Sequence, residues 1–499
     1  MARCLLLSVS FTPLGIVIPI LLLPLLLPGC AFDPSGIPDR FRDAGSFTDA
    51  VTFDGAGGDA AGADAALCET GYDLVDGQCI NTRMVPCAPL SASELPANAE
   101  EVQVDVEITF TEGEGWSEPT PCSWVCISGY VEDSGKCFPE QGWLLGWSHR
   151  IGLTTDHEKI SADLVHFPMA VFLKAGNGDT SRVFDNIGDN PLRLAITDDA
   201  PSPSQYYVEI DHWDSTAGLG VLHVGRPGDL LPSTANKTLY LYYDNDQEEN
   251  TAFVGFAGSQ AAIQVWNEDF RGVWHMAEPT GAAVINSTAT ADVNGTPVNA
   301  PVQASGRIGH ALSFSGPGPD QYVLIERRLT ATTDNWTLHA WINPAVLPQG
   351  PSNAAIIAYN GTDSGGYGMS VGNAGSGGSN FQAIYGSVGG GAGWIVSGYV
   401  LSSADTWYHV AITRSGGTTR FFVNGQQTHN ESSVAPVAVP DRFTLGGQLN
   451  RDGDPHPPRR YFNGRIDEVR ISSTARSLAW IIAEYHSGQD TLFTYGPEE

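Results

Sequence analysis

Basic residues are scarce in this chain of 499 residues. Lysine and arginine together number 25 against 56 aspartates and glutamates, so the formal net charge is −31 at pH 7. Phosphate recognition needs clustered cations, and the composition therefore argues against a nucleic-acid-binding protein. It also argues against docking on anionic lipid through a basic patch. A charge this far from zero favours solubility, with an acidic binding face as the alternative.

Motifs of the common enzyme classes are also missing. The sequence contains neither the His-Glu-x-x-His motif of zinc proteases nor a P-loop. One Gly-x-Ser-x-Gly pattern surrounds Ser370, but a nucleophile elbow requires a helix directly afterwards, and a Gly/Ser-rich segment follows instead. We therefore predict that Ser370 is an ordinary strand residue. His409 alternates with Tyr408 and Val410, and we predict that it packs within a strand.

Histidine is absent from the cysteine-rich region between residues 68 and 137, which disfavours a zinc site there. The even number of cysteines in an exported context predicts disulfides, and six cysteines allow fifteen pairings. Residues 68–79 and 126–137 share the pattern Cys-x-x-Gly-Tyr…Gly-x-Cys. They look like small cysteine-rich modules of bacterial surface proteins. The alternation over 102–110 predicts a strand. The predicted disulfide cysteines are Cys68, Cys79, Cys87, Cys122, Cys126 and Cys137.

The amino-terminal 29 residues carry a long apolar run that is typical of an export signal. The run ends in Leu27-Pro28-Gly29-Cys30, which resembles the bacterial lipobox. The resemblance implies lipidation of Cys30, an anchor in the membrane, and sorting of this cell-envelope protein to the outer membrane because Ala31 follows. The alternative is a transmembrane helix. Four prolines interrupt the run and no basic cluster follows it, so we favour the lipid anchor.

Composition suggests five segments. Ala, Gly, Asp, Ser and Pro dominate after Cys30 without an apolar period, which predicts an extended tether. Short strands at regular spacing then predict two β domains. In the first, the stretches Trp147–Ile151, Asn190–Ile196 and Thr238–Asn245 resemble a bacterial domain of uncharacterised function. The predicted boundaries are 1–29 (signal peptide), 30–66 (tether), 67–141 (cysteine-rich module), 142–262 (β domain) and 263–490 (jelly roll).

The clearest strand pattern begins at Trp407-Tyr408-His409-Val410. It turns at Gly416-Gly417, returns as far as Asn424-Gly425, and alternates apolar and polar residues on both arms. Together with the run Phe462–Ile471, it resembles the laminin-G-like jelly roll, a concanavalin-type β-sandwich. The resemblance implies an all-β, multidomain protein with this sandwich at its carboxy-terminal end, preceded by a smaller β-sandwich. The helical period of 479–485 predicts a closing helix.

One acidic segment suggests catalysis. Glu209-Ile-Asp211-His-Trp-Asp214 resembles the Glu-x-Asp-x-x-Glu strand of concanavalin-type glycoside hydrolases, whose retaining mechanism needs two carboxyls about 5–5.5 Å apart. The last residue is Asp rather than Glu, and the segment lies outside the predicted jelly roll. We therefore favour an exposed acidic strand face, and we predict that the protein is not an enzyme.

Two kinds of binding site are candidates in the jelly roll. Concanavalin-type sandwiches often bind a structural Ca²⁺ through loop oxygens, and the candidate ligands are Asn286, Asp292 and Asp467, with turn capping as the alternative. For sugar binding, the candidate aromatic platforms are Tyr367, Trp394 and Tyr399, with core packing as the alternative.

These observations predict a lipid-anchored surface protein whose jelly roll binds a glycan or a protein without catalysis. A polysaccharide-active enzyme on the same scaffold and a purely structural envelope protein are the alternatives.

Overall fold

The computed structural model describes residues 72–75, 78–111, 114–133, 135–139, 142–330, 334–348, 354–362, 365–372, 378–386, 392–433, 436, 442–449 and 460–499. The chain divides into two compact units, residues 1–77 and 78–499. In the first unit, the described part contains the strand β1 (Asp73–Val75). All the features below belong to the second unit. Strands make up most of its regular structure, so the prediction of an all-β, multidomain protein is confirmed.

Short antiparallel pairs form the cysteine-rich region. Disulfides join Cys87 to Cys122 and Cys126 to Cys137. Cys79 is disulfide-bonded too, whereas Cys68 lies outside the described residues. The strands are β2 (Gln78–Pro86), β3 (Ala99–Val102), β4 (Asp105–Thr111), β5 (Gly115–Trp116), β6 (Ser123–Cys126), β7 (Tyr130–Asp133) and β8 (Lys136–Pro139).

The strand predicted over 102–110 is two strands. β3 pairs with β6, whereas β4 pairs with β2, so the chain changes partner between Val102 and Asp105. The alternation of apolar residues continues across this break, which is why the sequence does not reveal it.

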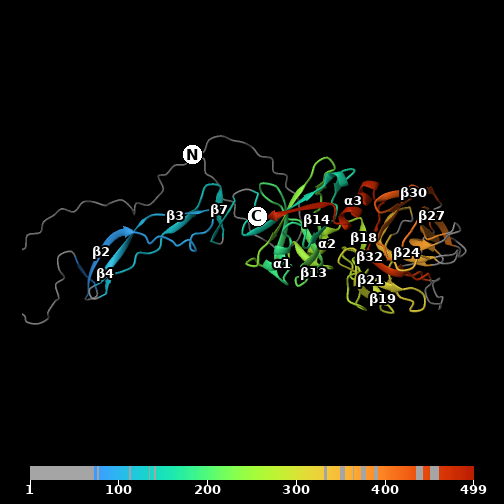
Figure 1. Ribbon diagram of the computed structural model, residues 1–499, viewed down its shortest axis with the longest axis horizontal. Coiled ribbons are helices and arrows are strands. Elements are labelled where there is room, and N and C mark those ends of the chain that lie inside the picture. The colour runs from blue at the N-terminus through green and yellow to red at the C-terminus, as the bar shows by residue number, and fades with distance from the viewer. Residues whose placement is uncertain are drawn as a thin grey trace, which may run out of the picture. The chain divides into compact units, whose positions relative to one another are not determined.

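Two four-stranded sheets form the middle domain, which is drawn mainly in green in Figure 1. One core of aliphatic and aromatic side chains fills this domain. The first sheet consists, in spatial order, of β11 (Met169–Leu173), β14 (Leu219–Gly225), β13 (Tyr207–Asp214) and β17 (Val254–Phe256). The second consists of β12 (Leu194–Asp198), β16 (Thr238–Tyr243), β9 (His149–Thr155) and β33 (Phe493–Glu498). Smaller elements are the 3-10 helix η1 (His157–Lys159), β10 (Leu164–Val165), α1 (Ser181–Ile187), β15 (Leu230–Leu231) and α2 (Gln260–Val265).

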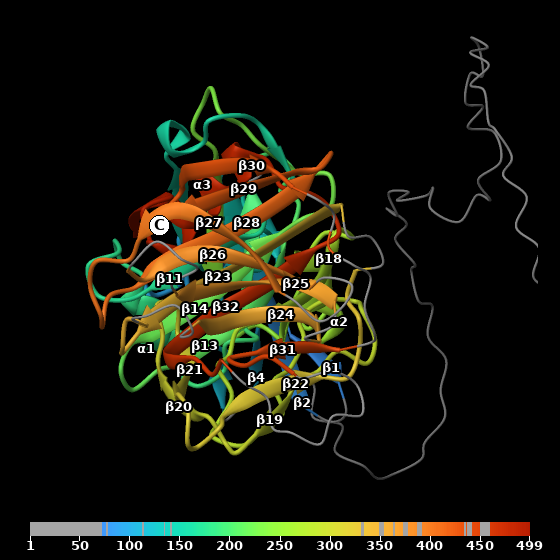
Figure 2. The ribbon, with the colours of Figure 1, turned by 90° about the vertical axis from the view of Figure 1, so that its right-hand side faces the viewer.

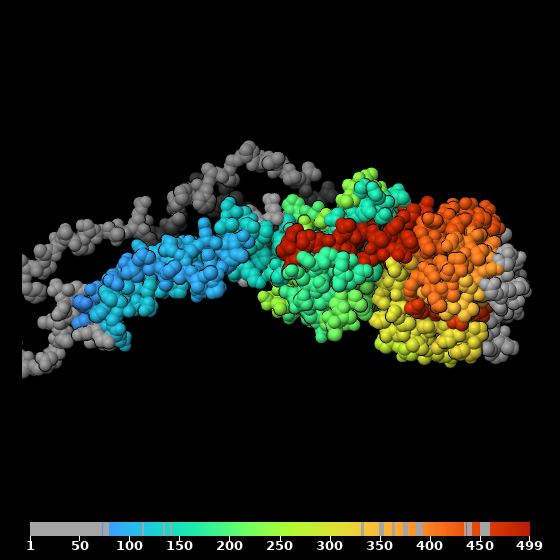
Figure 3. Space-filling model, viewed as in Figure 1, coloured from blue at the N-terminus to red at the C-terminus, as the bar shows by residue number. Residues whose placement is uncertain are grey.

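The carboxy-terminal end of the chain completes this middle domain. β33 pairs antiparallel with β9, and Figure 3 shows the carboxy-terminal segment lying along the surface of the middle domain. The predicted closing helix is present as α3 (Leu478–Gly488). Its Trp480 packs against Phe167 of the middle domain, with ring centroids 4.9 Å apart. The domain predicted over 142–262 is therefore built from two distant stretches of the chain.

The carboxy-terminal sandwich consists of two antiparallel layers, which Figure 2 shows one in front of the other. A second core fills the space between them. One layer runs β20 (Val302–Ser305), β21 (His310–Ser315), β32 (Asn463–Ser472), β23 (Asn335–Pro344), β28 (Tyr408–Ser415), β29 (Thr418–Val423) and β30 (Gln426–Ser432), and β18 (Phe270–Trp274) also pairs with β32. The other runs β19 (Thr296–Val298), β22 (Tyr322–Ile325), β31 (Phe443–Leu445), β24 (Ala355–Thr362), β25 (Gly365–Gly372), β26 (Asn380–Gly386) and β27 (Ala392–Val400).

Both predicted hairpin turns are confirmed. Gly416 and Gly417 have φ angles of 56° and 74°, and Asn424 and Gly425 have φ angles of 51° and 75°. Two consecutive positive φ angles are the geometry of the tight turn that matches the twist of antiparallel strands. Ser370 lies within β25, as predicted. β30 was not predicted because its residues are mostly polar and exposed, so no period-two signal marks it.

Candidate functional site

A cluster of buried acidic and histidine side chains lies between the middle domain and the carboxy-terminal sandwich. The middle domain contributes Glu209 and Asp211 from β13 and His223 from β14. The sandwich contributes His275, which directly follows β18, and Glu468 of β32. Glu209 and His223 lie opposite each other in the β13–β14 pair, so both side chains leave the same face of that sheet.

Irregularities in two strands bring the carboxylates of this cluster together. The register between β13 and β14 shifts between Ile210 and His212, so Asp211 is the extra residue of a bulge. In β32, Glu468 has a φ angle of 51°, at a second register shift opposite His339 and Trp341. Bulges redirect side chains and often lie next to functional sites. Here the second bulge buries both Asp467 and Glu468, although they are consecutive in the strand.

His275 links the carboxylates of the two domains. Its Nδ1 lies 2.5 Å from Oε1 of Glu468, and its Nε2 lies 3.3 Å from Oε1 of Glu209. Two donors hold Glu209 in place: Nε1 of Trp266 donates to Oε2 at 2.6 Å, and Oγ of Ser287 donates to Oε1 at 2.5 Å. Every member of this chain of contacts is at most about one twentieth exposed.

His223 and Asp211 belong to the same buried arrangement. The His223 ring stacks on His275 at 4.5 Å between centroids. Its Nε2 lies 3.6 Å from Oε1 of Glu468 and 3.8 Å from Oδ2 of Asp211. Neither nitrogen of His223 and neither carboxylate oxygen of Asp211 has a hydrogen-bond partner, and both side chains are 1% exposed.

Charge interactions inside the cluster shift the pKa values of its members. Burial alone would lower the pKa of His275, but the charges of Glu468 and Glu209 raise it well above its usual range. Burial would raise the pKa of Glu468, but His275 and Arg470 hold it well below its usual range. Burial and the Glu468 charge raise the pKa of Asp467. Within the cluster, the charged form of His275, the ionised form of Glu468 and the neutral form of Asp467 are therefore favoured relative to the same groups in water.

A second buried group continues the network into the sandwich. Arg470 of β32 donates to Oε2 of Glu468, and its Nη1 lies 3.7 Å from Oε1 of Glu484 in α3. Nε2 of His339 lies 3.1 Å from the same oxygen of Glu484. Burial would raise the pKa of Glu484, but His339 and Arg470 lower it to about 2. Burial and His339 lower the pKa of His409 to about 3. His409 therefore belongs to a polar cluster rather than to apolar packing alone.

The prediction of an exposed acidic face on β13 is wrong for two of its three residues. Glu209 and Asp211 are buried because this strand faces the neighbouring domain, and only Asp214 is exposed. A polysaccharide cannot reach the Glu209–Asp211 pair without opening the contact between the domains. The geometry of the pair consequently gives no support to a glycoside hydrolase mechanism, which requires both carboxyls to flank the substrate.

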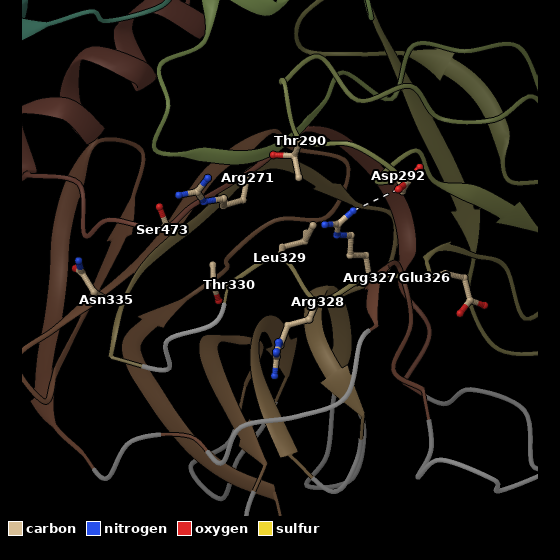
Figure 4. A pocket seen from close by; sticks show the side chains of 10 residues that line it. All are labelled: Arg271, Thr290, Asp292, Glu326, Arg327, Arg328, Leu329, Thr330, Asn335 and Ser473. Atoms are coloured by element: carbon tan, nitrogen blue, oxygen red, sulfur yellow. Dashed lines mark hydrogen bonds and ion pairs between the residues drawn. The ribbon is translucent and has the colours of Figure 1, made fainter.

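A groove of about 880 Å³ lies at one end of the sandwich (Figure 4). Arg271, Arg327 and Arg328 line it, together with the acidic residues Asp292 and Glu326. Nη1 of Arg327 lies 3.5 Å from Oδ2 of Asp292. Glu326 is paired with Arg442, whose Nη1 lies 3.2 Å from its Oε1. Three arginines against two carboxylates line the groove, and Arg442 neutralises one of these carboxylates, so the groove is locally basic on a chain whose net charge is −31.

The three predicted aromatic platforms occupy different environments. Tyr367 is 1% exposed and stacks on Trp336 at 3.9 Å, so the structure places it in the core and not on a ligand-facing surface. Trp394 is half-buried against an apolar cluster, with the guanidinium of Arg460 5.1 Å from its ring centroid. Tyr399 is half-buried and lines a separate pocket of about 450 Å³ near α3.

The three predicted calcium ligands are engaged in other interactions. Asn286 caps a turn: its amide oxygen accepts from the backbone N–H of Val273, and its amide nitrogen donates to the carbonyl oxygen of Thr288. Asp292 pairs with Arg327 in the groove. Oδ2 of Asp467 accepts from the backbone N–H groups of Arg307 and Ile308. Calcium at these residues stays a prediction. The described residues contain two other groups that could hold a metal ion: Asp211, His223, His275 and Glu468, and His339, His409 and Glu484.

Sequence reasoning missed His223, His275 and Glu468. Glu468 lies in a strand where alternation would point Asp467 and Glu468 to opposite faces, and the bulge is not visible in the sequence. His223 lies in an otherwise apolar strand, LGVLHVG. A histidine in such a context is a signal of a buried polar site, because an unpaired buried polar group is costly.

Comparison with known proteins supports the fold of the carboxy-terminal sandwich. Residues 317–482 match the model of the concanavalin A-like lectin/glucanases superfamily, so this part of the chain is a concanavalin A-like domain. The predicted resemblance is confirmed for this region. None of the curated proteins compared with the chain matches it.

Solved structures similar to the chain include domain 4 of AbnA, a GH43 extracellular arabinanase from Geobacillus stearothermophilus, in complex with arabinotriose. It is 17% identical, with a TM-score of 0.33, and the match covers 45% of this chain and 98% of that domain. The receptor-binding domain of botulinum neurotoxin type G is 13% identical, with a TM-score of 0.32, covering 44% of this chain and 51% of that one. The binding domain of Paraclostridial Mosquitocidal Protein 1 is 12% identical, with a TM-score of 0.32, covering 44% and 52%. The chain thus spans about half the length of the two toxin domains. At such identities and scores these similarities carry no functional conclusion.

Proposed function

We propose that this protein is a non-catalytic, lipid-anchored binding protein of the bacterial cell envelope, whose concanavalin A-like domain binds an acidic carbohydrate. The observation that carries the proposal is the groove lined by Arg271, Arg327 and Arg328. The chain has few basic residues, yet three arginines surround one opening (Figure 4).

Arginine is suited to this ligand class. Its planar guanidinium presents a rigid set of donors that matches a carboxylate or sulfate group in two parallel hydrogen bonds. The groove volume of about 880 Å³ lies within the range of pockets that enclose small ligands or a few sugar units. The side chains come from separate segments of the sandwich: Arg271 from β18, and Arg327 and Arg328 from the connection after β22. A rigid scaffold therefore holds the donors apart, as recognition of an extended anion requires.

The carboxylates at the groove allow a test in which ligand binding is expected to become tighter. Asp292 has a side chain 89% exposed and competes with a ligand for Arg327. Its φ angle of 58° is one that asparagine also tolerates, so Asp292→Asn removes the charge without straining the backbone. A ligand that is recognised as an anion should bind this variant more tightly.

The test measures binding of polygalacturonate to the full chain by isothermal titration calorimetry. We expect Arg271→Gln and Arg327→Gln each to weaken binding by about tenfold, since a hydrogen bond to a charged group contributes about 1.5 kcal/mol or more. Asp292→Asn should strengthen binding two- to fivefold, and added salt should weaken it. Arg83→Gln removes the same charge from an exposed arginine of β2 and is the matched control.

Binding of neutral dextran and of polyglutamate is measured in the same way. Equal binding of polygalacturonate to all the arginine variants would overturn the proposal. Binding of polyglutamate alone, with the same dependence on the arginines, would replace the carbohydrate ligand with an acidic protein.

A further inference from the structure

We propose that Asp211, His223, His275 and Glu468 bind one divalent transition-metal ion, such as Zn²⁺, between the middle domain and the concanavalin A-like domain. This site is separate from the arginine-lined groove and does not depend on the function proposed for that groove. The four residues come from both domains, so the ion would fasten one domain to the other.

The first argument is geometric. One ligand atom from each of the four side chains lies within 4.8 Å of the atoms of the others. Two imidazole nitrogens and two carboxylate oxygens form a donor set that suits zinc and related first-row metals. The separations of 3.6 Å and 3.8 Å from Nε2 of His223 to Glu468 and Asp211 are close to those between ligands that share one tetrahedral ion.

The second argument is the state of the unpartnered atoms. Asp211 has a side chain that is 1% exposed, and neither of its oxygens accepts a hydrogen bond. His223 is equally buried, and neither of its nitrogens has a partner. Burying an ionised carboxylate without a compensating charge is costly, so buried charges are normally paired or coordinate a metal. Nε2 of His223 and Oδ2 of Asp211 lie 3.8 Å apart, so a single ion could bind both atoms.

The third argument concerns the side chains that hold the His275 ring in its orientation. Ligand histidines usually donate their second ring N–H to a carboxylate, which fixes the ring orientation. Nε2 of His275 faces Oε1 of Glu209 at 3.3 Å, and Trp266 and Ser287 hold that carboxylate in turn. Nδ1 is then the ligand atom. In the structure it lies 2.5 Å from Oε1 of Glu468, and a hydrogen bond joins the pair. The metal would replace this hydrogen bond and widen the contact.

Two neighbouring charged or acidic side chains, Arg470 and Asp467, make their contacts away from the proposed metal position. Arg470 is directed to Oε2 of Glu468, the oxygen that faces away from His275, so Oε1 stays available for an ion. Asp467 is turned toward the backbone N–H groups of Arg307 and Ile308. Glu209 is a positioning residue in this arrangement, and its part is to orient His275.

The test uses the full chain, stripped with EDTA and then dialysed against ZnCl₂. We expect one zinc ion per chain to be retained, and we expect zinc to raise the thermal unfolding midpoint. Asp211→Asn and His223→Gln should each weaken zinc binding by more than about 100-fold, and Glu209→Gln by about 10- to 100-fold. His429→Gln, at a histidine of β30 whose side chain is 41% exposed, should leave zinc binding unchanged and controls for surface binding.

Cobalt substitution keeps the proposal testable if a variant fails to fold. Co²⁺ bound to the unmodified chain should give the visible absorption of a four-coordinate nitrogen and oxygen site, and crystals grown with zinc should give an anomalous peak beside His223. Retention of no zinc, or loss of zinc in His429→Gln but not in Asp211→Asn, would overturn the proposal and leave the cluster as a proton-linked ion-pair network.

Discussion

At the scale of single residues, the buried side chain of His409 is expected to make the fold sensitive to acid. His409 lies in β28 next to His339 and Trp341, whose ring centroid is 5.2 Å away. Burial, reinforced by His339, lowers its pKa from 6.5 to about 3. When folding lowers the pKa of a histidine, the stability linked to that histidine is fully present at pH values above its pKa in the unfolded chain. Below that pH, the unfolded chain takes up a proton that the folded chain cannot accept, so stability falls from about pH 6.5 toward pH 3.

Replacing His409 should remove this part of the acid sensitivity. Between pH 6.5 and 4.5, we expect the free energy of unfolding to fall by about 2 kcal/mol less in His409→Phe than in the unmodified chain. Each pH unit of a one-proton difference between the folded and unfolded chains is worth about 1.4 kcal/mol. Urea unfolding at both pH values measures it. His429→Phe, at an exposed position, should behave like the unmodified chain. Parallel pH curves for all three proteins would contradict this role.

At the scale of elements, the pairing of β33 with β9 explains why the middle domain needs the end of the chain. Leu492 and Phe493 are buried in its core, and the OH of Tyr495 donates to the side chain of Asp490. Residues 493–498 pair with a strand more than 330 positions earlier. Without β33, the edge of β9 would lose its pairing partner and present unsatisfied backbone groups, which promote association between chains.

Ending the chain after Asp490 should therefore destabilise the middle domain. Loss of two buried side chains costs about 2 kcal/mol each, so we expect a lower unfolding temperature and some self-association. Differential scanning calorimetry and size-exclusion chromatography measure these effects. Removing Glu499 alone breaks its ion pair with Arg150, whose side chain is 13% exposed, and two backbone hydrogen bonds between the same residues, but it leaves Leu492 and Phe493 in the core and should cost less than the longer truncation. An unchanged unfolding temperature after the longer truncation would show that β33 is dispensable.

At the scale of the whole molecule, charge is unevenly distributed. The chain carries 56 acidic residues, and yet the groove at the end of the sandwich gathers three arginines and lies beside a fourth. A basic recognition site on an acidic protein attracts anions locally, while the net charge keeps copies of the protein apart. The described residues contain no helix long and apolar enough to cross a membrane. The predicted anchor at Cys30 lies outside the described residues and stays part of the proposed function.

The anchor is tested by Cys30→Ser in the full chain. We expect the unmodified protein to fractionate with membranes and to carry the added mass of lipid at Cys30, because two or more acyl chains hold a protein firmly on a bilayer. The variant should lose both the added mass and the membrane association. Membrane fractionation and mass spectrometry measure these properties. An unmodified Cys30 in the membrane-bound protein would contradict the lipid anchor.

The sequence alone determined the features that depend on neighbouring residues. Alternating residues along the chain revealed most strands of both β domains, and Gly416-Gly417 and Asn424-Gly425 marked their hairpin turns, because period and turn chemistry are local properties. The even cysteine count likewise indicated disulfides. Neither the pairing partners nor the groove could be read in this way, since Arg271 and Arg327 line one groove only when β18 of one layer packs near the connection that follows β22 of the other layer.

Only the tertiary structure decided the surroundings of the acidic strand β13. Glu209 and Asp211 gave the pattern of a catalytic or solvent-exposed strand, and folding buries them against residues as distant as Glu468, through His275. The Glu468 bulge and the return of β33 to β9 are likewise set by contacts across the fold. A local pattern specifies which side chains share a strand face, but what that face meets depends on packing between elements far apart in the chain.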